Sequence, residues 1–319
     1  MQKRKLGRLG PEVPPIVLGG NVYGWTLDEA ASFRQLDRAV DAGLNCIDTA
    51  DVYSRWVPGH QGGESETIIG KWLAKRGRRD DVLIATKVGM DMGDGKKGLS
   101  PASIEQAVEA SLRRLQTETI DLYQAHTDDQ TVLPELTLTA FDKLIQAGKV
   151  RYIGASNYSG SRLAHAMEAS KKIGVPSYVS LQPHYNLVQR GDFETDLLRI
   201  VKKYELGVLP YFSLAAGFLT GKYRRGSDTT HAARGSMVKK YFNDQGFAVV
   251  DALIEVADGH NATPAQVALA WLLAQPGVTA PIASATSDQH LDDLIAAANL
   301  RLDGASLRLL TDVSSPVPA

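Results

Sequence analysis

The chain has 319 residues, a length that suits one α/β barrel, for which about 250 residues or more are typical. Hydrophobic residues make up 44% of it and charged residues 22%, which excludes a disordered or fibrous chain and indicates a soluble globular protein. The 35 Lys and Arg residues balance 36 Asp and Glu residues, so no net charge favours nucleic acid or a membrane surface as a partner.

The sequence carries no signal for export or membrane insertion. No apolar segment follows the basic residues of MQKRKLGRLGPEV, and no run reaches about 18 apolar residues. Cys46 is the single cysteine, which excludes an internal disulfide. We therefore expect one soluble, cytoplasmic domain over residues 1–319.

Eight short apolar runs alternate with segments of helical period, after a glycine-containing segment at residues 3–13 that predicts a β-hairpin. The predicted strands are 15–20, 44–48, 81–87, 119–126, 149–157, 178–182, 207–211 and 278–283. This alternation predicts a parallel sheet, and eight strands close a (β/α)8 TIM barrel, with the hairpin covering its floor. An open doubly wound sheet is the alternative, but it normally has a glycine-rich phosphate turn after its first strand, and no G-x-G-x-x-G is present.

The helical segments carry end signals. Residues 29–43 and 100–115 have apolar residues three and four apart, and the second opens with Ser100 as N-cap before Pro101. Gly43 and Gly148 are predicted to end helices in the left-handed conformation. Residues 262–278 predict a packing helix that begins after Thr263.

Polar side chains stand at the ends of six consecutive predicted strands. They are Asp48, Lys87, His126, Ser156 with Asn157, Gln182 and Tyr211. A polar residue at one strand end is ordinary, but in a parallel barrel all these ends face one mouth, where barrel enzymes keep their sites.

Four of the side chains near this mouth suit carbonyl reduction. A phenol with an ordinary pKa near 10 is a weak acid at neutral pH, and a neighbouring ammonium lowers that pKa. Tyr53 and Lys87 supply this pair, Asp48 would keep Lys87 charged, and the imidazole of His126 would bind the carbonyl oxygen. No side chain donates a hydride, so a cofactor must.

The order of these segments resembles the aldo-keto reductase family over nearly the whole chain. NCIDTADVYSRW (45–56) with GESETIIGKWL (63–73), IATKVG (84–89), IDLYQAH (120–126) and GKVRYIGASNYS (148–159) are similar to its motifs. LQPHYN (181–186), PYFSLAAGFLTGKY (210–223) and PIASATSDQHLDDL (281–294) follow in family order. The resemblance implies an NADPH-dependent reductase of small aldehydes or ketones, in which Asp48, Tyr53, Lys87 and His126 are catalytic.

The resemblance also implies a cofactor site. Ser156 and Asn157, with Gln182 as their partner, would hold the nicotinamide carboxamide, Tyr211 would stack on the nicotinamide ring, and Lys222 would hold the pyrophosphate. The full set of expected cofactor residues is Gly20, Asn21, Ser156, Asn157, Gln182, Tyr211, Phe212, Leu214, Gly217, Lys222, Arg234, Ser284, Thr286, His290 and Asp293.

The last motif departs from the family at the 2′-phosphate position. Many members offer Lys or Arg there, whereas this chain has Ser284, Thr286 and His290, which bind a dianion less firmly than a guanidinium does. We therefore expect a modest preference for NADPH, with NADH possible. The basic segment 222–242 either supplies the missing charge through Arg224, Arg225 or Arg234, or is a solvated surface; the sequence leaves both open.

Two tryptophans follow strand ends, and Trp25 and Trp56 either wall the substrate pocket or pack loops over the barrel. The remaining histidines have no metal-ligand spacing, so no metal site is expected. A nucleotide-sensing regulatory subunit is the alternative function, because some relatives of the family are channel-associated β-subunits. A Schiff-base lyase using Lys87 is disfavoured, since Asp48 would keep that lysine charged.

Overall fold

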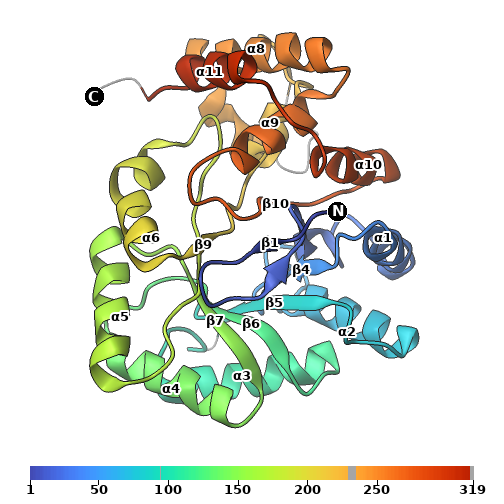
Figure 1. Ribbon diagram of the computed structural model, residues 1–319. Helices are drawn as coiled ribbons and strands as arrows, with labels where there is room; N and C mark the ends of the chain where they lie inside the picture. Colours follow the sequence, from blue (N-terminus) through green and yellow to red (C-terminus); the bar gives the residue numbers. More distant parts are fainter. Residues whose placement is uncertain (94, 229–234, 317–319) are drawn as a thin grey trace.

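The computed structural model describes residues 1–93, 95–228 and 235–316, and its centre is a parallel barrel (Figure 1). The strands lie in the order β10-β3-β4-β5-β6-β7-β8-β9. Their bounds are β3 (Val17–Gly19), β4 (Cys46–Asp48), β5 (Leu83–Val88), β6 (Ile120–Ala125), β7 (Val150–Ser156), β8 (Ser180–Gln182), β9 (Gly207–Val208) and β10 (Ile282–Ala283). Each coincides with one of the eight predicted runs, with β5 extending one residue past its run, and this confirms the predicted strand order.

Backbone hydrogen bonds between β9 and the segment leading into β10 close the barrel. The Val208 amide donates to the Gly277 carbonyl at 3.2 Å, and its carbonyl accepts from Thr279 at 2.8 Å. One step further along, the Ile282 amide donates to the Pro210 carbonyl at 2.9 Å. The closed barrel is therefore confirmed over the open sheet.

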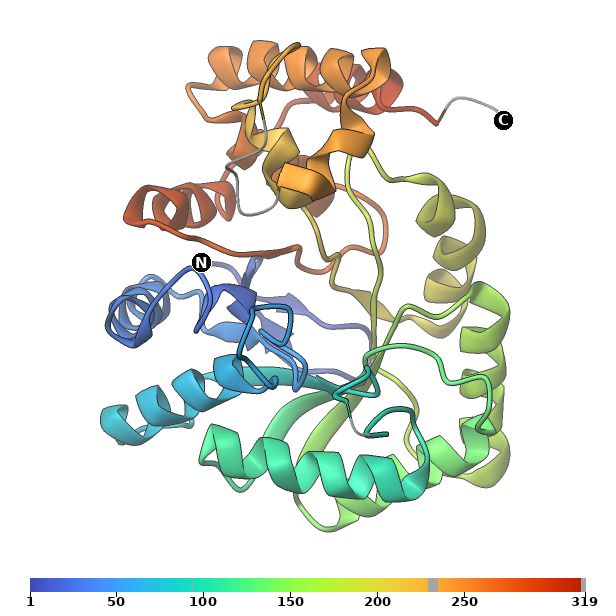
Figure 2. The same cartoon turned by 180° about the vertical axis from the view of Figure 1, so that it is seen from behind.

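Helices surround the barrel in both views (Figures 1 and 2). Helices between consecutive strands include α1 (Glu29–Asp41), α2 (Glu64–Arg76), α3 (Pro101–Leu115), α4 (Pro134–Gln146), α5 (Gly160–Ile173), α6 (Leu198–Tyr204) and α9 (Pro264–Leu273), and α10 (Asp288–Ala297) follows the last strand. Two further helices, α8 (Asp244–His260) and α11 (Gly304–Val313), pack on each other at the outside, near α9. The remaining helical segments are short: η1 (Gly20–Val22), η2 (Phe193–Leu197), η3 (Ala215–Thr220), α7 (Gly235–Val238) and η4 (Lys239–Tyr241).

The predicted helix ends are present. The Ser100 hydroxyl accepts from the Ser103 amide at 3.2 Å, which caps α3. Gly43 and Gly148 have φ angles of +89° and +71°, the left-handed region that glycine enters without a Cβ clash. Among the helices of residues 1–93, 95–228 and 235–316, none is long and apolar enough to cross a membrane.

The N-terminal hairpin closes the floor of the barrel. Strands β1 (Arg4–Lys5) and β2 (Glu12–Val13) are antiparallel, and Leu6 and Val13 are buried against inward side chains of the barrel strands. The Arg8 amide donates to the Glu205 carbonyl at 2.9 Å, just before β9 begins. The hairpin therefore seals the amino-terminal end of the strands and leaves the opposite end as the mouth.

The barrel interior has an apolar layer below and a polar layer above. Alternate residues of a strand point to the same side, so Cys46 lies one step below Asp48, and Ala85 one step below Lys87. Cys46 is buried in the apolar layer next to the floor. Burial raises the pKa of its thiol, and the charge of Asp48 raises it further.

Candidate active site

The register of the sheet brings the predicted strand-end residues to one level of the barrel. Gly19 pairs with Asp48 on adjacent strands, Lys87 with Gln124, and Ser156 with Gln182. Because the strands are parallel, the side chains of Asp48, Lys87, Ser156 and Gln182 lie at the carboxyl ends of their strands, away from the hairpin floor. The expected convergence at one mouth is present.

Lys87 stands at the centre of a buried ionic cluster. Its Nζ donates to Asp48 Oδ2 at 2.7 Å, to the Thr49 carbonyl at 2.7 Å and to the Tyr53 hydroxyl at 3.1 Å. Lys87 is 0% exposed and Asp48 2% exposed. Burial alone would lower the pKa of the Lys87 ammonium, but the charges of Asp48 and Tyr53 outweigh it and raise that pKa. The lysine is therefore a permanent cation beside a phenol.

Two glutamine amides hold the other oxygen of Asp48. Gln182 Nε2 donates to Asp48 Oδ1 at 2.9 Å, and Gln124 Nε2 donates to the same atom at 3.3 Å. The two amides therefore fix the orientation of the carboxylate whose other oxygen accepts from Lys87. Gln124 was not predicted from the sequence. It lies two residues before His126, so the alternation of a strand places both side chains on the same face and could have indicated Gln124 as a site residue.

His126 lies at the edge of this cluster. Its ring centroid is 6.1 Å from that of Tyr53, in an edge-on arrangement. Burial lowers the pKa of the imidazole well below its usual range, and the charge of Lys87 lowers it further. His126 is thus neutral at physiological pH and offers a ring N–H rather than a positive charge.

Trp25 and Trp56 lie together beside Tyr53. Their ring centroids are 5.4 Å apart, and the Trp56 ring is 5.7 Å from the Tyr53 ring. Trp56 is 48% exposed, so its ring faces solvent on one side of the loop. The two indoles form an apolar rim next to the phenol.

A second polar group lies across the mouth, around Asn157. Tyr211 donates its hydroxyl hydrogen to Asn157 Oδ1 at 2.8 Å, and Asn157 Nδ2 donates to the His126 carbonyl at 2.8 Å. The Ser156 hydroxyl donates to the Gln182 backbone carbonyl at 2.9 Å. Gln182 thus accepts a hydrogen bond from Ser156 with its backbone carbonyl, while its side-chain amide donates to Asp48. The Tyr211 ring stacks on His184 with centroids 5.2 Å apart.

The segment after Tyr211 is held in an unusual backbone conformation. Phe212, Ala215 and Ala216 have φ angles of +51°, +48° and +57°, and Gly217 follows at +96°. Leu214 is the residue immediately before η3. Lys222 lies close to this segment, since a Cβ added at Gly217 would be 3.3 Å from Lys222 Nζ. Non-glycine residues at positive φ cost energy and cluster at ligand-binding loops.

The residues expected near the adenosine lie around the start of α10. Ser284 Oγ donates to Asn21 Oδ1 at 2.6 Å, and the Thr286 hydroxyl lies 2.9 Å from His290 Nδ1. Gly20 packs tightly, since a Cβ there would lie 3.0 Å from the Asp48 carbonyl. Asp293 instead accepts from Thr263 at 3.1 Å and from Gln266 at 2.8 Å, which ties α10 to α9.

The basic segment after η3 is described only in part. Arg224 donates to the Gly221 carbonyl, and Arg225 forms a 2.7 Å ion pair with Asp244. Arg234 lies outside the described residues. Neither described arginine reaches a residue at the start of α10 through a hydrogen bond or ion pair given by the structure.

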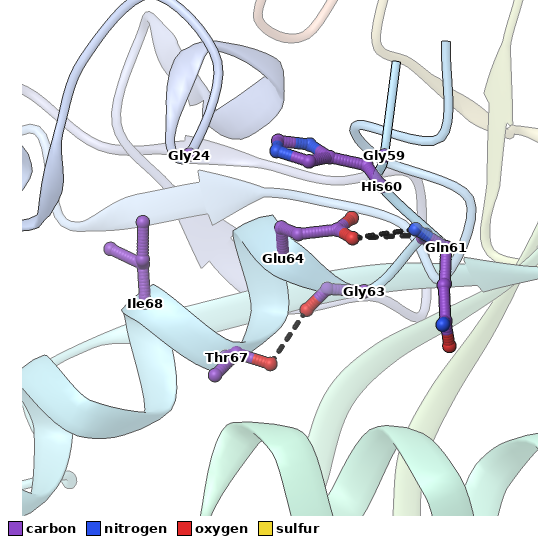
Figure 3. Close-up of a pocket in the computed structure, with 9 residues that line it drawn as sticks. Gly24, Gly59, His60, Gln61, Gly63, Glu64, Thr67 and Ile68 are labelled. Carbon is purple, nitrogen blue, oxygen red and sulfur yellow. Dashed lines mark hydrogen bonds between the residues drawn. The ribbon is translucent and has the colours of Figure 1, made fainter. Parts of the chain in front are cut away.

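A separate open cavity of about 470 Å³ lies beside the loop between β4 and α2 (Figure 3). Its lining consists of Gly24, Gly59, His60, Gln61, Gly62, Gly63, Glu64, Thr67 and Ile68. Glu64 accepts from the backbone amides of Gln61 at 2.8 Å, Ser54 at 3.2 Å and Gly62 at 3.3 Å. The carboxylate is therefore engaged in shaping the loop, and the chemistry described above lies outside this cavity.

Comparison with known proteins assigns the chain to a class. The sequence model of the Aldo/keto reductase family matches residues 15–314. The chain therefore belongs to the aldo/keto reductase family, and it is an oxidoreductase. The (β/α)8 barrel is the fold of this class.

Particular relatives span nearly the whole chain. It is 36% identical over 321 residues to the Bacillus subtilis protein named uncharacterized oxidoreductase YrpG, covering 98% of this chain and 96% of that one. It is 33% identical to the Escherichia coli protein named Protein tas, covering 95% and 94%. It is also 34% identical to a Schizosaccharomyces pombe protein named putative voltage-gated potassium channel subunit beta, covering 90% and 85%.

Proposed function

We propose that this oxidoreductase reduces a small aldehyde or ketone by hydride transfer from NADPH, with Tyr53 as the proton donor. The observation that carries the proposal is the 3.1 Å contact between Tyr53 Oη and a buried Lys87 that is ion-paired with Asp48. This arrangement is what a phenol needs in order to act as an acid near neutral pH.

Each side chain has a defined task in the reaction. Tyr53 gives its hydroxyl proton to the carbonyl oxygen, and Lys87 stabilises the phenolate that remains. Asp48, fixed by Gln182 and Gln124, keeps Lys87 charged and oriented. Neutral His126 donates its ring N–H toward the same carbonyl oxygen, and Trp25 with Trp56 keeps water away from it.

The second polar group across the mouth fits a nicotinamide cofactor. Ser156, Asn157 and Tyr211 present amide and hydroxyl groups beside an aromatic face, and the strained turn at 215–217 leads to Lys222. NADPH or NADH, when bound, supplies the hydride. Ser284, Thr286 and His290 would hold the 2′-phosphate without a guanidinium, so we expect NADPH to be preferred modestly over NADH.

Tyr53→Phe tests the proposal, with NADPH and 4-nitrobenzaldehyde as the assay pair. We expect kcat to fall by at least about 1000-fold, because the proton donor is lost, and NADPH affinity to stay within about twofold. Cofactor fluorescence titration measures that affinity for NADPH and NADH alike. A variant that retains near wild-type kcat would exclude Tyr53 as the acid.

A regulatory, cofactor-sensing subunit is the second candidate function. The similarity to the fission yeast protein named as a channel β-subunit favours it. The same titration separates the two candidates: cofactor binding without turnover of any tested aldehyde or ketone supports the regulatory role, and turnover supports the reductase.

A further inference from the structure

Asp51 lies two residues before Tyr53, on the loop that follows β4, and the mechanism above does not use it. Its side chain is 4% exposed. The charged and titratable groups that act on it come from four elements: Glu66 on α2, Arg114 on α3, Tyr123 on β6 and Lys87 on β5. Glu66 and Tyr123 are fully buried as well. Asp51 therefore belongs to a polar cluster enclosed within the protein.

The only arginine in this cluster is already committed to Glu66. Arg114 donates from Nε to Glu66 Oε2 at 2.7 Å, and the Thr86 hydroxyl donates to Glu66 Oε1 at 2.6 Å. Among the residues that the structure describes, Asp51 Oδ1 and Tyr123 Oη have no hydrogen-bond partner. An ionised Asp51 would thus be a second buried carboxylate without a cation of its own, which is costly.

A neutral carboxylic acid fits this position better. Burial raises the pKa of Asp51 to about 8, and the charge of Glu66 raises it as well. The charge of Arg114, a hydrogen bond from the Val52 backbone amide and the charge of Lys87 oppose the rise only in part. Burial and the charge of Glu66 thus both favour the protonated carboxyl group.

The Asp51 loop is joined directly to the catalytic lysine. The Thr49 carbonyl accepts from Lys87 Nζ at 2.7 Å, and the Asp51 amide donates to the Lys87 carbonyl at 3.3 Å. Tyr53 follows two residues later, and its hydroxyl accepts a hydrogen bond from the same Nζ at 3.1 Å. Residue 51 is therefore joined through the backbone to the lysine whose ammonium contacts the phenol.

We propose that Asp51 is a positioning residue, a neutral carboxylic acid that anchors the Tyr53 loop in the Glu66–Arg114–Tyr123 cluster and loosens that loop when it ionises. This inference rests on the proposed role of Tyr53 as proton donor. It predicts that ionisation of Asp51 weakens reduction at alkaline pH.

The decisive variant is Asp51→Asn, a neutral side chain of the same shape. With NADPH and 4-nitrobenzaldehyde, wild-type kcat is expected to fall as pH rises through about 8, whereas Asp51→Asn keeps kcat within about threefold up to at least one pH unit higher.

Asp51→Ser, smaller but also neutral, is expected to shift the decline in kcat to higher pH as well, and it replaces the asparagine variant if that variant does not fold. Asp80→Asn, which removes an exposed carboxylate, is the matched control and should reproduce the wild-type profile. An alkaline decline at the same pH in Asp51→Asn and wild type would overturn the proposal.

Two measurements without turnover separate this proposal from the proposed function. A carboxyl group whose pKa is raised by folding favours the folded state less and less as pH rises, so the thermal midpoint of Asp51→Asn relative to wild type should increase between about pH 4 and 8 and then level off. Tryptophan emission, which senses Trp56 next to Tyr53, should change between pH 7 and 9 in wild type and not in Asp51→Asn. If both hold but no carbonyl compound is reduced, the reductase assignment fails and the anchoring by Asp51 stands. A flat midpoint difference, or equal emission changes, would overturn the anchoring whatever the activity.

Discussion

At the scale of single residues, Lys87 keeps its charge inside the protein because oxygen atoms surround its ammonium. The Asp48 carboxylate, the Thr49 carbonyl and the Tyr53 hydroxyl all lie within 3.1 Å of Nζ. Such a pair stabilises the fold only while both partners are present, since removal of one leaves a buried charge uncompensated. Lys87 therefore links the stability of the fold to the proposed activity.

Lys87→Met should damage both properties. We expect kcat to fall more than about tenfold, or 1.4 kcal/mol, and the free energy of unfolding to fall by about 3–5 kcal/mol because Asp48 loses its cation. Urea unfolding and steady-state kinetics measure the two effects. The double variant Asp48→Asn/Lys87→Met should recover much of the stability and none of the activity. Stability that is unchanged in the single variant would mean that the ion pair is not a structural element.

The strand ends show how much of the site could be predicted from sequence. Asp48, Lys87 and His126 were predicted because a polar residue after an apolar run is visible in the sequence, and the barrel brings them together. Gln124 and Asp51 were missed. Their environment depends on which side chains face them from other strands and helices, and no local pattern contains that information.

At the scale of elements, α9 shows a helix end that does more than cap its own helix. The Thr263 hydroxyl accepts from the Gln266 amide at 3.3 Å and donates to Asp293 on α10 at 3.1 Å. Gln266 completes a capping box and also donates to Asp293 at 2.8 Å. One threonine thus fixes two neighbouring helices.

Thr263→Ala should therefore cost more than an ordinary cap. We expect a loss of about 1–2 kcal/mol in the free energy of unfolding, against about 1 kcal/mol or less for Ser159→Ala, which removes the cap of α5. Thermal unfolding of both variants gives the comparison. Equal losses would show that the bond to Asp293 adds nothing.

Helix and strand positions followed from local patterns, but their extents did not. The run at 207–211 predicted a strand as long as its neighbours, whereas β9 covers Gly207–Val208 only. Pro210 lacks an amide hydrogen, and the chain turns at Tyr211 and Phe212 into the positive-φ segment. The long-range contacts of that turn, rather than its apolar residues, set where the strand ends.

At the scale of the whole molecule, the floor and the mouth of the barrel are separate. The hairpin residue Leu6 is 1% exposed among inward apolar side chains, while Leu9 at the hairpin turn is 56% exposed. The polar layer that carries Asp48 and Lys87 lies on the far side of the apolar layer. Damage at the floor should therefore reduce stability without changing the chemistry.

Leu6→Ala should lower the free energy of unfolding by about 2–5 kcal/mol, since it leaves a cavity in a packed interior. Its matched control, Leu9→Ala, should change that free energy by no more than about 0.5 kcal/mol. Chemical denaturation gives the stability, and kcat per folded molecule should remain at the wild-type value in both. A drop in kcat for folded Leu6→Ala would mean that the floor communicates with the mouth.

The pairing of β3 with β10 has a consequence for how the molecule is made. Val17 pairs with Ile282 and Leu18 with Ala283, so the first barrel strand can form this pairing only after the last strand has been synthesised. Until nearly the whole polypeptide has left the ribosome, β3 keeps an unpaired edge, and so does β9, whose own partner is the segment before β10. Open edges of this kind attract other chains. Two nascent copies can therefore associate through these edges during synthesis, and a chaperone that shields strand edges should raise the yield of native protein.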